Sequence, residues 1–180
     1  MSIFDKLKGG IQAAKGDSTF TFAALPESLA DLKALPEASL DTPFKTAALA
    51  VCALCAYAAE PAIGTEMLDF LRGPRPLSNL DKSFLKDRFM DGKYYVPFSY
   101  FKGATPDNDY TPAEPFEITV NENPYSYQNE GYATLYITSG GADSPRPVTL
   151  RKTTEGKWCL WQHESLLTSI RAPKTSNPWA

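Results

Sequence analysis

Three cysteines and a single histidine carry the most reactive side chains in this chain of 180 residues. Cys52 and Cys55 have the C-x-x-C spacing of redox and zinc sites, and Cys159 with His163 would complete a Cys3His zinc set. A redox pair usually lies at a helix N-terminus, where the dipole lowers the thiol pKa. This pair stands amid alanine and leucine instead, and the other two ligands lack a zinc-knuckle spacing. We therefore interpret the pair as core residues and expect neither a metal nor a cofactor.

His163 is the residue that a Ser-His-Asp or Cys-His hydrolase in this chain would have to use. It follows a predicted strand and adjoins Glu164, which is a plausible place for a general base. The sequence has no G-x-S-x-G and no other nucleophile signature. We favour a structural histidine and expect no catalytic residues, so a non-enzymatic protein is favoured over an enzyme.

Two loops have the composition of ion sites. Asp107, Asp109 and Glu114 offer oxygen ligands for calcium, but Pro112 stands where an EF-hand loop needs glycine. The stretch Ser139–Gly141 with Arg146 resembles an anion cradle, yet no helix follows to add its dipole. We interpret both loops as connections whose residues set turn geometry.

Tyrosine is concentrated in one part of the chain, because eight of the nine tyrosines fall between residues 94 and 136. Tyrosine combines a large contact area with a polar tip and loses little rotamer entropy on binding, which suits a recognition surface. The alternative is that these rings cover a small sheet and stiffen its loops. The candidate ligand-binding residues are Tyr100, Tyr110, Tyr125, Tyr127, Tyr132, Tyr136 and His163.

Composition and charge exclude several classes of protein. The net charge of −3 disfavours a nucleic-acid partner, which would need a basic surface. Residues 144–180 are nevertheless basic, with six Lys/Arg and two Asp/Glu, and form either a solvated rim or a surface for phosphate or an acidic partner. Odd cysteine usage and a charged first stretch, without a signal peptide, favour the cytoplasm. The longest uncharged apolar run, 46–59, is too short to span a bilayer.

The first half of the chain has helical patterns. Residues 1–20 are assigned to a loosely attached N-terminal segment whose residues 3–15 form an amphipathic helix. A short helix is expected over Leu25–Pro36, with Pro26 in its first turn. A helix over Phe44–Ala59, capped by Asp41 or Thr42, is apolar all round and is predicted to be the central core helix.

Two more helices precede the change of pattern. Thr65 is expected to cap Glu66–Arg72, which Gly73 ends. Ser78 with Asp81 forms a capping box for the next helix. That helix is predicted to end at Gly92 and to turn inward Leu80, Phe84, Leu85 and Phe89.

The second half alternates as strands do. Tyr95–Tyr100 is predicted as an edge strand interrupted by Pro97, and a further strand is centred on Ile118. In Tyr132–Thr138 one face consists of Ala133, Leu135 and Ile137. Glu155-Gly156 turns the chain between two paired strands. The inward residues of that hairpin are Val148, Leu150, Trp158 and Leu160, and a last short helix is expected over Glu164–Ile170.

Helices followed by strands predict an α+β fold, in which an N-terminal helical layer around a buried alanine-rich helix packs on a C-terminal antiparallel sheet of about 4–5 strands. No linker or repeat divides the chain, so residues 1–180 are expected to form one domain.

Several stretches carry a resemblance to a known family. They are LPESLADLKALPEASLDTPFKTAALAVCALCAYA, FLRGPRPLS, PFSYFKGATPDNDYTP, EGYATLYI, SGGADSPRPVTLR and GKWCLW. Together they resemble an uncharacterised bacterial family known as a domain of unknown function, over nearly the whole chain. This resemblance implies no activity and no functional residues. The closing hairpin, VTLRKTTEGKWCLW, is similar to the last strands of NTF2-like cone folds, which host enzymes and plain scaffolds alike.

Three hypotheses about function remain. The first is a binding module whose tyrosine-rich strand face and loops contact a protein, a peptide or a small ligand. The second is a cone-fold-type ligand carrier or enzyme, with a pocket between sheet and helices and His163 or Glu130 as acid–base group. The third is a membrane-peripheral protein that uses residues 3–15.

Overall fold

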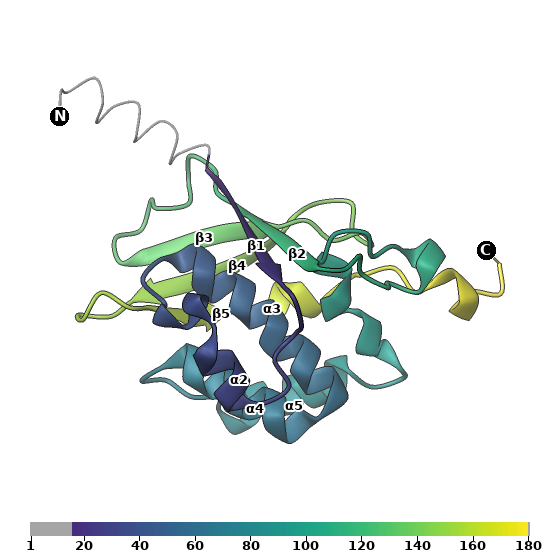
Figure 1. Cartoon of the computed structure of the whole chain (residues 1–180), viewed down its shortest axis with the longest axis horizontal. Helices are drawn as coiled ribbons and strands as arrows, with labels where there is room; N and C mark the ends of the chain where they lie inside the picture. The colour runs from purple at the N-terminus through teal and green to yellow at the C-terminus, as the bar shows by residue number, and fades with distance from the viewer. Residues whose placement is uncertain (1–15, 180) are drawn as a thin grey trace.

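The computed structural model describes residues 16–179, in which an antiparallel sheet packs on a layer of helices (Figure 1). The five strands follow one another in the sheet in sequence order. They are β1 (Asp17–Phe22), β2 (Phe116–Asn121), β3 (Tyr132–Ile137), β4 (Arg146–Lys152) and β5 (Trp158–Gln162). The predicted α+β architecture is therefore confirmed.

Helix α3 (Pro43–Ala59) is the centre of the molecule, as its sequence predicts. Thr42 caps it by accepting a hydrogen bond from the Lys45 backbone N–H at 3.3 Å, and Pro43 occupies the first turn, where no N–H is needed. Nearly every residue from Thr46 to Cys55 is fully buried, and the helix contacts all five strands as well as α4 (Pro61–Arg72). Its small alanines permit this close approach on every side.

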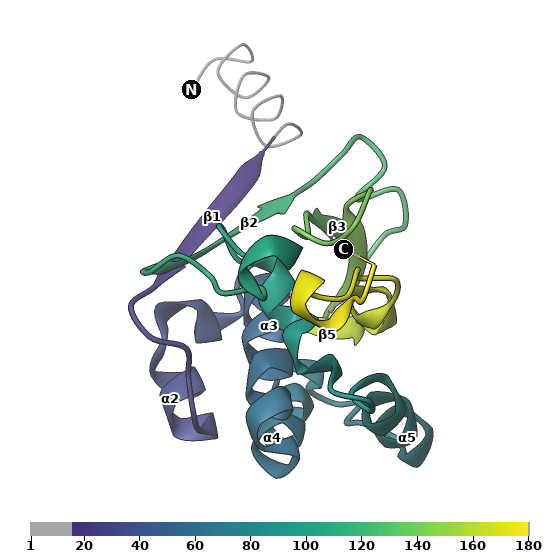
Figure 2. The same cartoon turned by 90° about the vertical axis from the view of Figure 1, so that its right-hand side faces the viewer.

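The other helices lie on the far side of α3 from the sheet (Figure 2). Helix α2 (Leu29–Ala34) begins later than predicted, because Ser28 accepts the Asp31 N–H and caps it. Helix α4 begins earlier than predicted: Pro61 takes the first position, so Thr65 is not a cap and its hydroxyl donates to the Pro61 carbonyl at 2.7 Å. It ends at Gly73, as predicted.

Helix α5 (Asn79–Arg88) carries the predicted capping box between Ser78 and Asp81. The expectation that Leu80 turns inward is wrong, because Leu80 is 80% exposed. It stands in the first turn, where this short helix faces solvent. Leu85 and Phe89 are buried as predicted.

Strand β1 was not predicted, since residues up to 20 were assigned to an N-terminal helix; residues 3–15, the predicted helix itself, lie outside the described part of the chain. All six residues of β1 pair with β2. Phe22 is buried and Phe20 packs against the core. The alternation of Phe20 and Phe22 with Thr19 and Thr21 is the signal that would have identified the strand.

The predicted edge strand Tyr95–Tyr100 is also wrong, because the chain there forms the 3-10 helices Lys93–Tyr95 and Pro97–Tyr100. Pro97 starts the second of these, a position that suits its fixed φ and missing N–H. The helix expected over Glu164–Ile170 shortens to the 3-10 helix Glu164–Leu167, since Ser169 has a positive φ of 58°.

Strand β3 has the predicted inward face, with Ala133, Leu135 and Ile137 fully buried. Val148 and Leu150 of β4 and Leu160 of β5 complete this face, which packs on α3. In register, Tyr132 pairs with Arg151, and Arg151 pairs with Cys159. These three residues consequently share the outer face of the sheet, turned away from α3.

Candidate functional site

A cavity of about 430 Å³ lies at the β5 edge of the sheet, beside the connection from α4 to α5. Its lining contains four basic side chains and no Asp or Glu. The four basic residues, Arg72, Arg75, Arg151 and Lys152, form the cation cluster. The lining residues are Arg72, Pro74, Arg75, Arg151, Lys152, Thr153, Thr154, Cys159 and Trp161. Its size and its polar groups suit a small ligand or one group of a larger ligand.

Arg72 is the deepest of the four cations. It is the last residue of α4, and its side chain is only 2% exposed. Nε donates to the Arg75 carbonyl at 3.0 Å and Nη2 lies 3.5 Å from the Asp81 carboxylate, whereas buried Nη1 has no hydrogen-bond partner among the described residues. Burial lowers the Arg72 pKa, and the neighbouring charge of Arg75 lowers it further. Arg72 therefore has one donor without a partner among the described residues, and nearby Asp81, Glu164 and Asp69 partly offset the positive charge of Arg75.

Trp161 contacts two of the other cations, Arg75 and Arg151, through its ring. The Arg75 guanidinium carbon lies 3.6 Å from the centre of the indole ring and that of Arg151 lies 4.6 Å from it, distances at which the ring quadrupole attracts a cation. Arg75 also donates to the Trp161 carbonyl at 2.5 Å, which satisfies an acceptor on the open edge of β5. Tyr132 meets Trp161 edge to face at 5.8 Å and lies under Arg151.

Cys159 lies at the base of the cavity, packed against Gly73. A Cβ at Gly73 would come within 2.7 Å of the Cys159 sulfur, and the Gly73 φ of +60° also favours glycine. Burial raises the pKa of the Cys159 thiol above its usual value. The thiol is therefore protonated at neutral pH and serves as a small apolar wall.

His163 lies behind Arg72 and is 1% exposed. Neither ring nitrogen has a hydrogen-bond partner among residues 16–179. Burial lowers its pKa, Glu164 opposes that effect, and the positive charge of Arg72 reinforces it. The ring is consequently neutral at pH 7, and it lines none of the cavities described here.

Two of the tyrosines predicted to bind a ligand are buried and hydrogen-bonded within the fold. The Tyr100 hydroxyl donates to the Leu166 carbonyl at 2.6 Å, and the Tyr110 hydroxyl donates to the Arg171 carbonyl at 2.5 Å. Burial raises both pKa values, that of Tyr110 to about 12. Their phenols serve as hydrogen-bonded braces for the C-terminal segment, and Tyr100 also lines a cavity of about 450 Å³.

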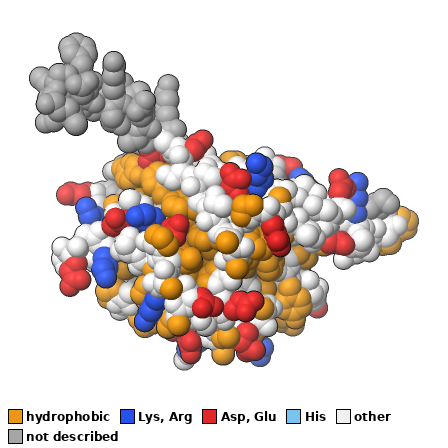
Figure 3. Space-filling model, viewed as in Figure 1, with side chains coloured by type: hydrophobic (Ala, Val, Ile, Leu, Met, Phe, Trp, Pro, Cys, Tyr) orange, Lys and Arg blue, Asp and Glu red, His pale blue; other side chains and the backbone are white. Residues whose placement is uncertain are grey.

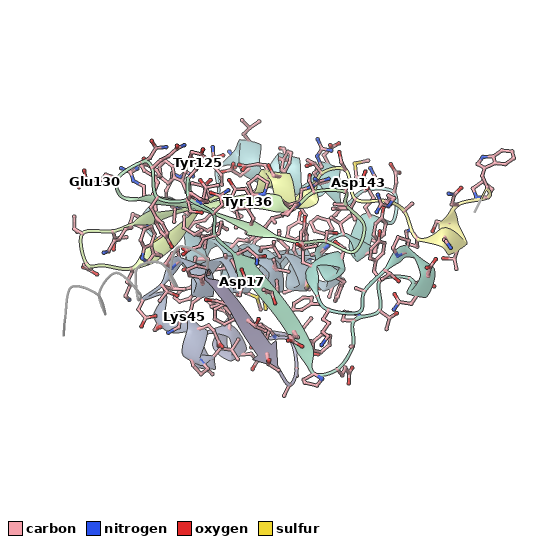
Figure 4. The ribbon with its side chains drawn as sticks, turned by 90° about the horizontal axis from the view of Figure 1, so that it is seen from above. Asp17, Lys45, Tyr125, Glu130, Tyr136 and Asp143 are labelled. Carbon is pink, nitrogen blue, oxygen red and sulfur yellow. The ribbon has the colours of Figure 1, made fainter. Side chains whose placement is uncertain are left out.

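The remaining tyrosines lie nearer the surface. Tyr125 is 69% and Tyr127 is 47% exposed, both in the connection from β2 to β3. Tyr132 and Tyr136 are half-buried on the outer face of β3, and Figure 4 shows Tyr136 and Tyr125 on the same side of the molecule. Of these four, Tyr132 reaches the cation cluster. A second, shallower cavity of about 320 Å³ lies across Tyr132 and Trp161 on the same face.

The C-x-x-C pair is buried in the core. Cys52 and Cys55 lie in α3, and burial raises both thiol pKa values strongly. Cys159 belongs instead to the outer face of β5. Among residues 16–179, no group of three or more His, Cys, Asp or Glu side chains is placed to hold a metal ion.

The residues of the suggested calcium loop have separate partners. Asp107 pairs with Lys174 at 2.5 Å, Asp109 accepts a hydrogen bond from Thr175, and Glu114 lines a different cavity. The two aspartates therefore brace the C-terminal segment, and the three carboxylates do not converge on one site.

Arg146, suggested as part of an anion cradle, has its guanidinium occupied by backbone acceptors. Nε donates to the Thr168 carbonyl and Nη2 to the Ser169 carbonyl, at 3.2 and 2.9 Å. Ser139, the other polar member of that cradle, is buried and donates to the Ser99 hydroxyl at 2.7 Å. The Ser-Gly-Gly stretch joins elements of the fold.

The residues of the second hypothesis are separated. His163 is buried, while Glu130 is exposed at the far end of the connection into β3 (Figure 4). The centre of the interface between α3 and the sheet is filled by fully buried side chains such as Leu49, Leu54 and Leu135, and a cavity lies at its margin, between Ala56 and Phe116. As for the membrane, no described helix has both the length and the apolarity that a bilayer crossing requires.

Sequence reasoning missed Arg72, Arg75, Arg151 and Trp161. The basic excess of residues 144–180 includes Arg151 and Lys152 without distinguishing them, and Arg72 and Arg75 come from a distant helix end. The stretch Arg72-Gly73-Pro74-Arg75 reads as a helix stop, and only the folded chain brings it against β5.

Comparison with known proteins adds one finding. A family model described as Domain of unknown function (DUF6935) matches residues 24–174, a range that holds every residue of the cation cluster. No curated protein and no solved structure matches the chain.

Proposed function

Because the chain belongs to the DUF6935 family, whose description names no activity, we propose a function from the residues alone: it is a binding module for a ligand that carries a phosphate group. The ligand places this group in the cavity among Arg72, Arg75, Arg151 and Lys152. The rest of the ligand extends over Tyr132 and Trp161, into the adjoining shallow cavity. This assigns the tyrosine-bearing face of the sheet to recognition and gives the chain no catalytic role.

The observation that carries the proposal is a cavity whose lining holds four cations and no Asp or Glu. Like charges held together raise the free energy of the empty site. A phosphate group that enters the cavity relieves this repulsion. Guanidinium groups suit this task, since their planar fork matches phosphate geometry.

Direct binding tests the proposal, with Trp161 as the reporter. The double variant Trp158→Phe/Trp179→Phe leaves Trp161 as the sole tryptophan of the chain. Its emission is followed at constant ionic strength while inorganic phosphate, a phosphorylated sugar or a phosphoserine peptide is added. We expect saturable changes in Trp161 emission. The probe that binds with the highest affinity identifies the kind of molecule that carries the phosphate.

Single substitutions then locate the site. Arg75→Gln and Arg151→Gln are each expected to weaken binding by about tenfold or more, because each removes a charge-assisted hydrogen bond worth roughly 1.5–3 kcal/mol. Lys93→Gln is the matched control, since it removes one positive charge from an exposed position outside the cavity lining. The proposal fails if no probe binds, or if the control loses as much affinity as the two arginine variants.

A further inference from the structure

Another cavity opens beside α3, and the charge of its lining is opposite to that of the basic cavity at β5. It has a volume of about 610 Å³ and lies between the end of β1, α3, the start of α4 and β2. Its acidic side chains are Glu27, Glu60 and Glu114, and its lining contains no Lys or Arg. The remaining lining is apolar: Ala23, Ala24, Leu25, Pro26, Cys55, Ala56, Ala59, Ile63, Phe98 and Phe116.

The surface around this groove differs from an ordinary polar surface. Hydrophobic side chains gather in the middle of the face that Figure 3 presents, with acidic groups among and around them. An apolar groove bordered by one sign of charge fits an amphipathic helix that carries the opposite charge.

The chain itself contains such a segment. At 3.6 residues per turn, Ile3, Phe4, Leu7 and Ile11 would share one face of a helix. On the same wheel the lysines of residues 3–15, Lys6, Lys8 and Lys15, border that face, and Asp5 stands opposite. The excess of two positive charges complements the three carboxylates of the groove.

The lengths also match. Gly16 directly precedes β1, and the lining of the groove begins at Ala23, directly after Phe22, which is the last residue of β1. Six strand residues span about 20 Å, and thirteen helical residues span about 20 Å as well. A segment that reverses direction at Gly16 therefore has the length to place residues 3–7 beside residues 23–27.

We propose that residues 3–15 dock as a helix into this groove of their own chain, with Ile3, Phe4 and Leu7 against Ala56 and Ile63 and the lysines against Glu27, Glu60 and Glu114. The groove is then an intramolecular interaction surface. This inference is independent of the phosphate site, because the two cavities share no lining residue.

Hydrogen exchange of the full chain, read by mass spectrometry, tests the docking. The variant Ile3→Ser/Phe4→Ser/Leu7→Ser removes the apolar face, and Asp5→Ser/Gln12→Ser is the matched control on the opposite face. We expect the triple variant to exchange about fivefold faster or more at residues 23–27 and 56–63, with the control unchanged, because a docked state favoured by that factor protects these amides.

Charge reversal gives a second readout. Lys6→Glu/Lys8→Glu is expected to accelerate exchange at the groove, and adding Glu27→Lys/Glu60→Lys to the same chain is expected to restore protection.

Equal exchange in the wild type and the triple variant would overturn the proposal. Protection that appears only at high protein concentration would also overturn it, because the segment would then dock into another copy of the chain. Binding of residues 3–15 to vesicles of phosphatidylcholine and phosphatidylserine, with groove exchange unaltered, would assign the segment to a membrane instead.

Discussion

At the scale of single residues, the most unusual group is His163. It is buried, both of its ring nitrogens lack partners within the described chain, and it stands beside the Arg72 guanidinium. Burial of such a ring costs free energy because its polar atoms lose water; burial also disfavours its protonation, which Arg72 opposes further and Glu164 favours.

Replacing His163 with leucine tests this description through pH. The folded-state pKa lies below the unfolded value of 6.5, so the unfolded chain binds the extra proton as pH falls. The stability of the wild type is therefore fully present above pH 6.5 and declines as pH drops below it. In His163→Leu we expect a flat profile between about pH 5 and 6.5 and, at pH 7, a stability equal to or up to about 2 kcal/mol above that of the wild type, because the unpartnered nitrogens are gone.

Urea unfolding at a series of pH values makes this measurement. The window is informative because the chain has one histidine, so no second imidazole titrates there. An unchanged slope in His163→Leu, or a loss of more than about 2 kcal/mol at pH 7, would mean that the ring makes contacts that this account lacks.

At the scale of elements, the contact between α3 and α4 depends on a single glycine. A Cβ on Gly64 would lie 2.3 Å from the Tyr57 Cα, a backbone atom that cannot move aside locally. Helix propensity alone favours alanine over glycine by about 1 kcal/mol, but overpacking costs about 1–3 kcal/mol and more where backbone must shift.

Gly64→Ala is therefore expected to destabilise the protein by about 2 kcal/mol, opposite in sign to its helix propensity. Glu66→Ala, at an exposed position of the same helix, is the matched control and should change stability by less than about 0.5 kcal/mol. Thermal unfolding followed by circular dichroism compares the two. A Gly64→Ala protein as stable as the wild type would show that the helices are not in close contact.

Elements with local signals were predictable from the sequence. Thr42-Pro43 before an apolar run fixed the start of α3, and Ser78 with Asp81 fixed that of α5. The alternation in Tyr132–Ile137 gave both the strand and its inward face. Strand β1 was missed although Phe20 and Phe22 alternate with threonines, and only its pairing with β2 shows that it belongs to the sheet. The expected strand Tyr95–Tyr100 was wrong for a local reason, because Pro97 starts a 3-10 helix.

The candidate site was less predictable, because segments that lie far apart in the sequence form it. Tyr132 was identified because exposed strand tyrosines suit recognition, and it does lie beside the cavity. Tyr100 and Tyr110 were placed with it, although nothing in their neighbourhood reveals that each hydroxyl meets a carbonyl more than 60 residues away. Arg72 and Arg75 act together with Arg151 only after the end of α4 has folded against β5.

At the scale of the whole molecule, two cavities carry opposite charge. The β5 edge carries Arg72, Arg75, Arg151 and Lys152 around Trp161, and the groove beside the end of β1 carries three glutamates around an apolar floor. A net charge of −3 conceals this separation, because the two regions largely cancel. The polarity explains why an acidic protein can present a strongly positive site.

The central claim is that the phosphate group of a ligand binds in the cavity at the β5 edge. Backbone NMR of the full chain, with inorganic phosphate added at constant ionic strength, locates the contact. The account predicts saturable shifts concentrated at residues 72–75, 151–154 and 159–161, with the groove around Ala56 unchanged. Shifts scattered over exposed lysines, or none in those three segments, would contradict it.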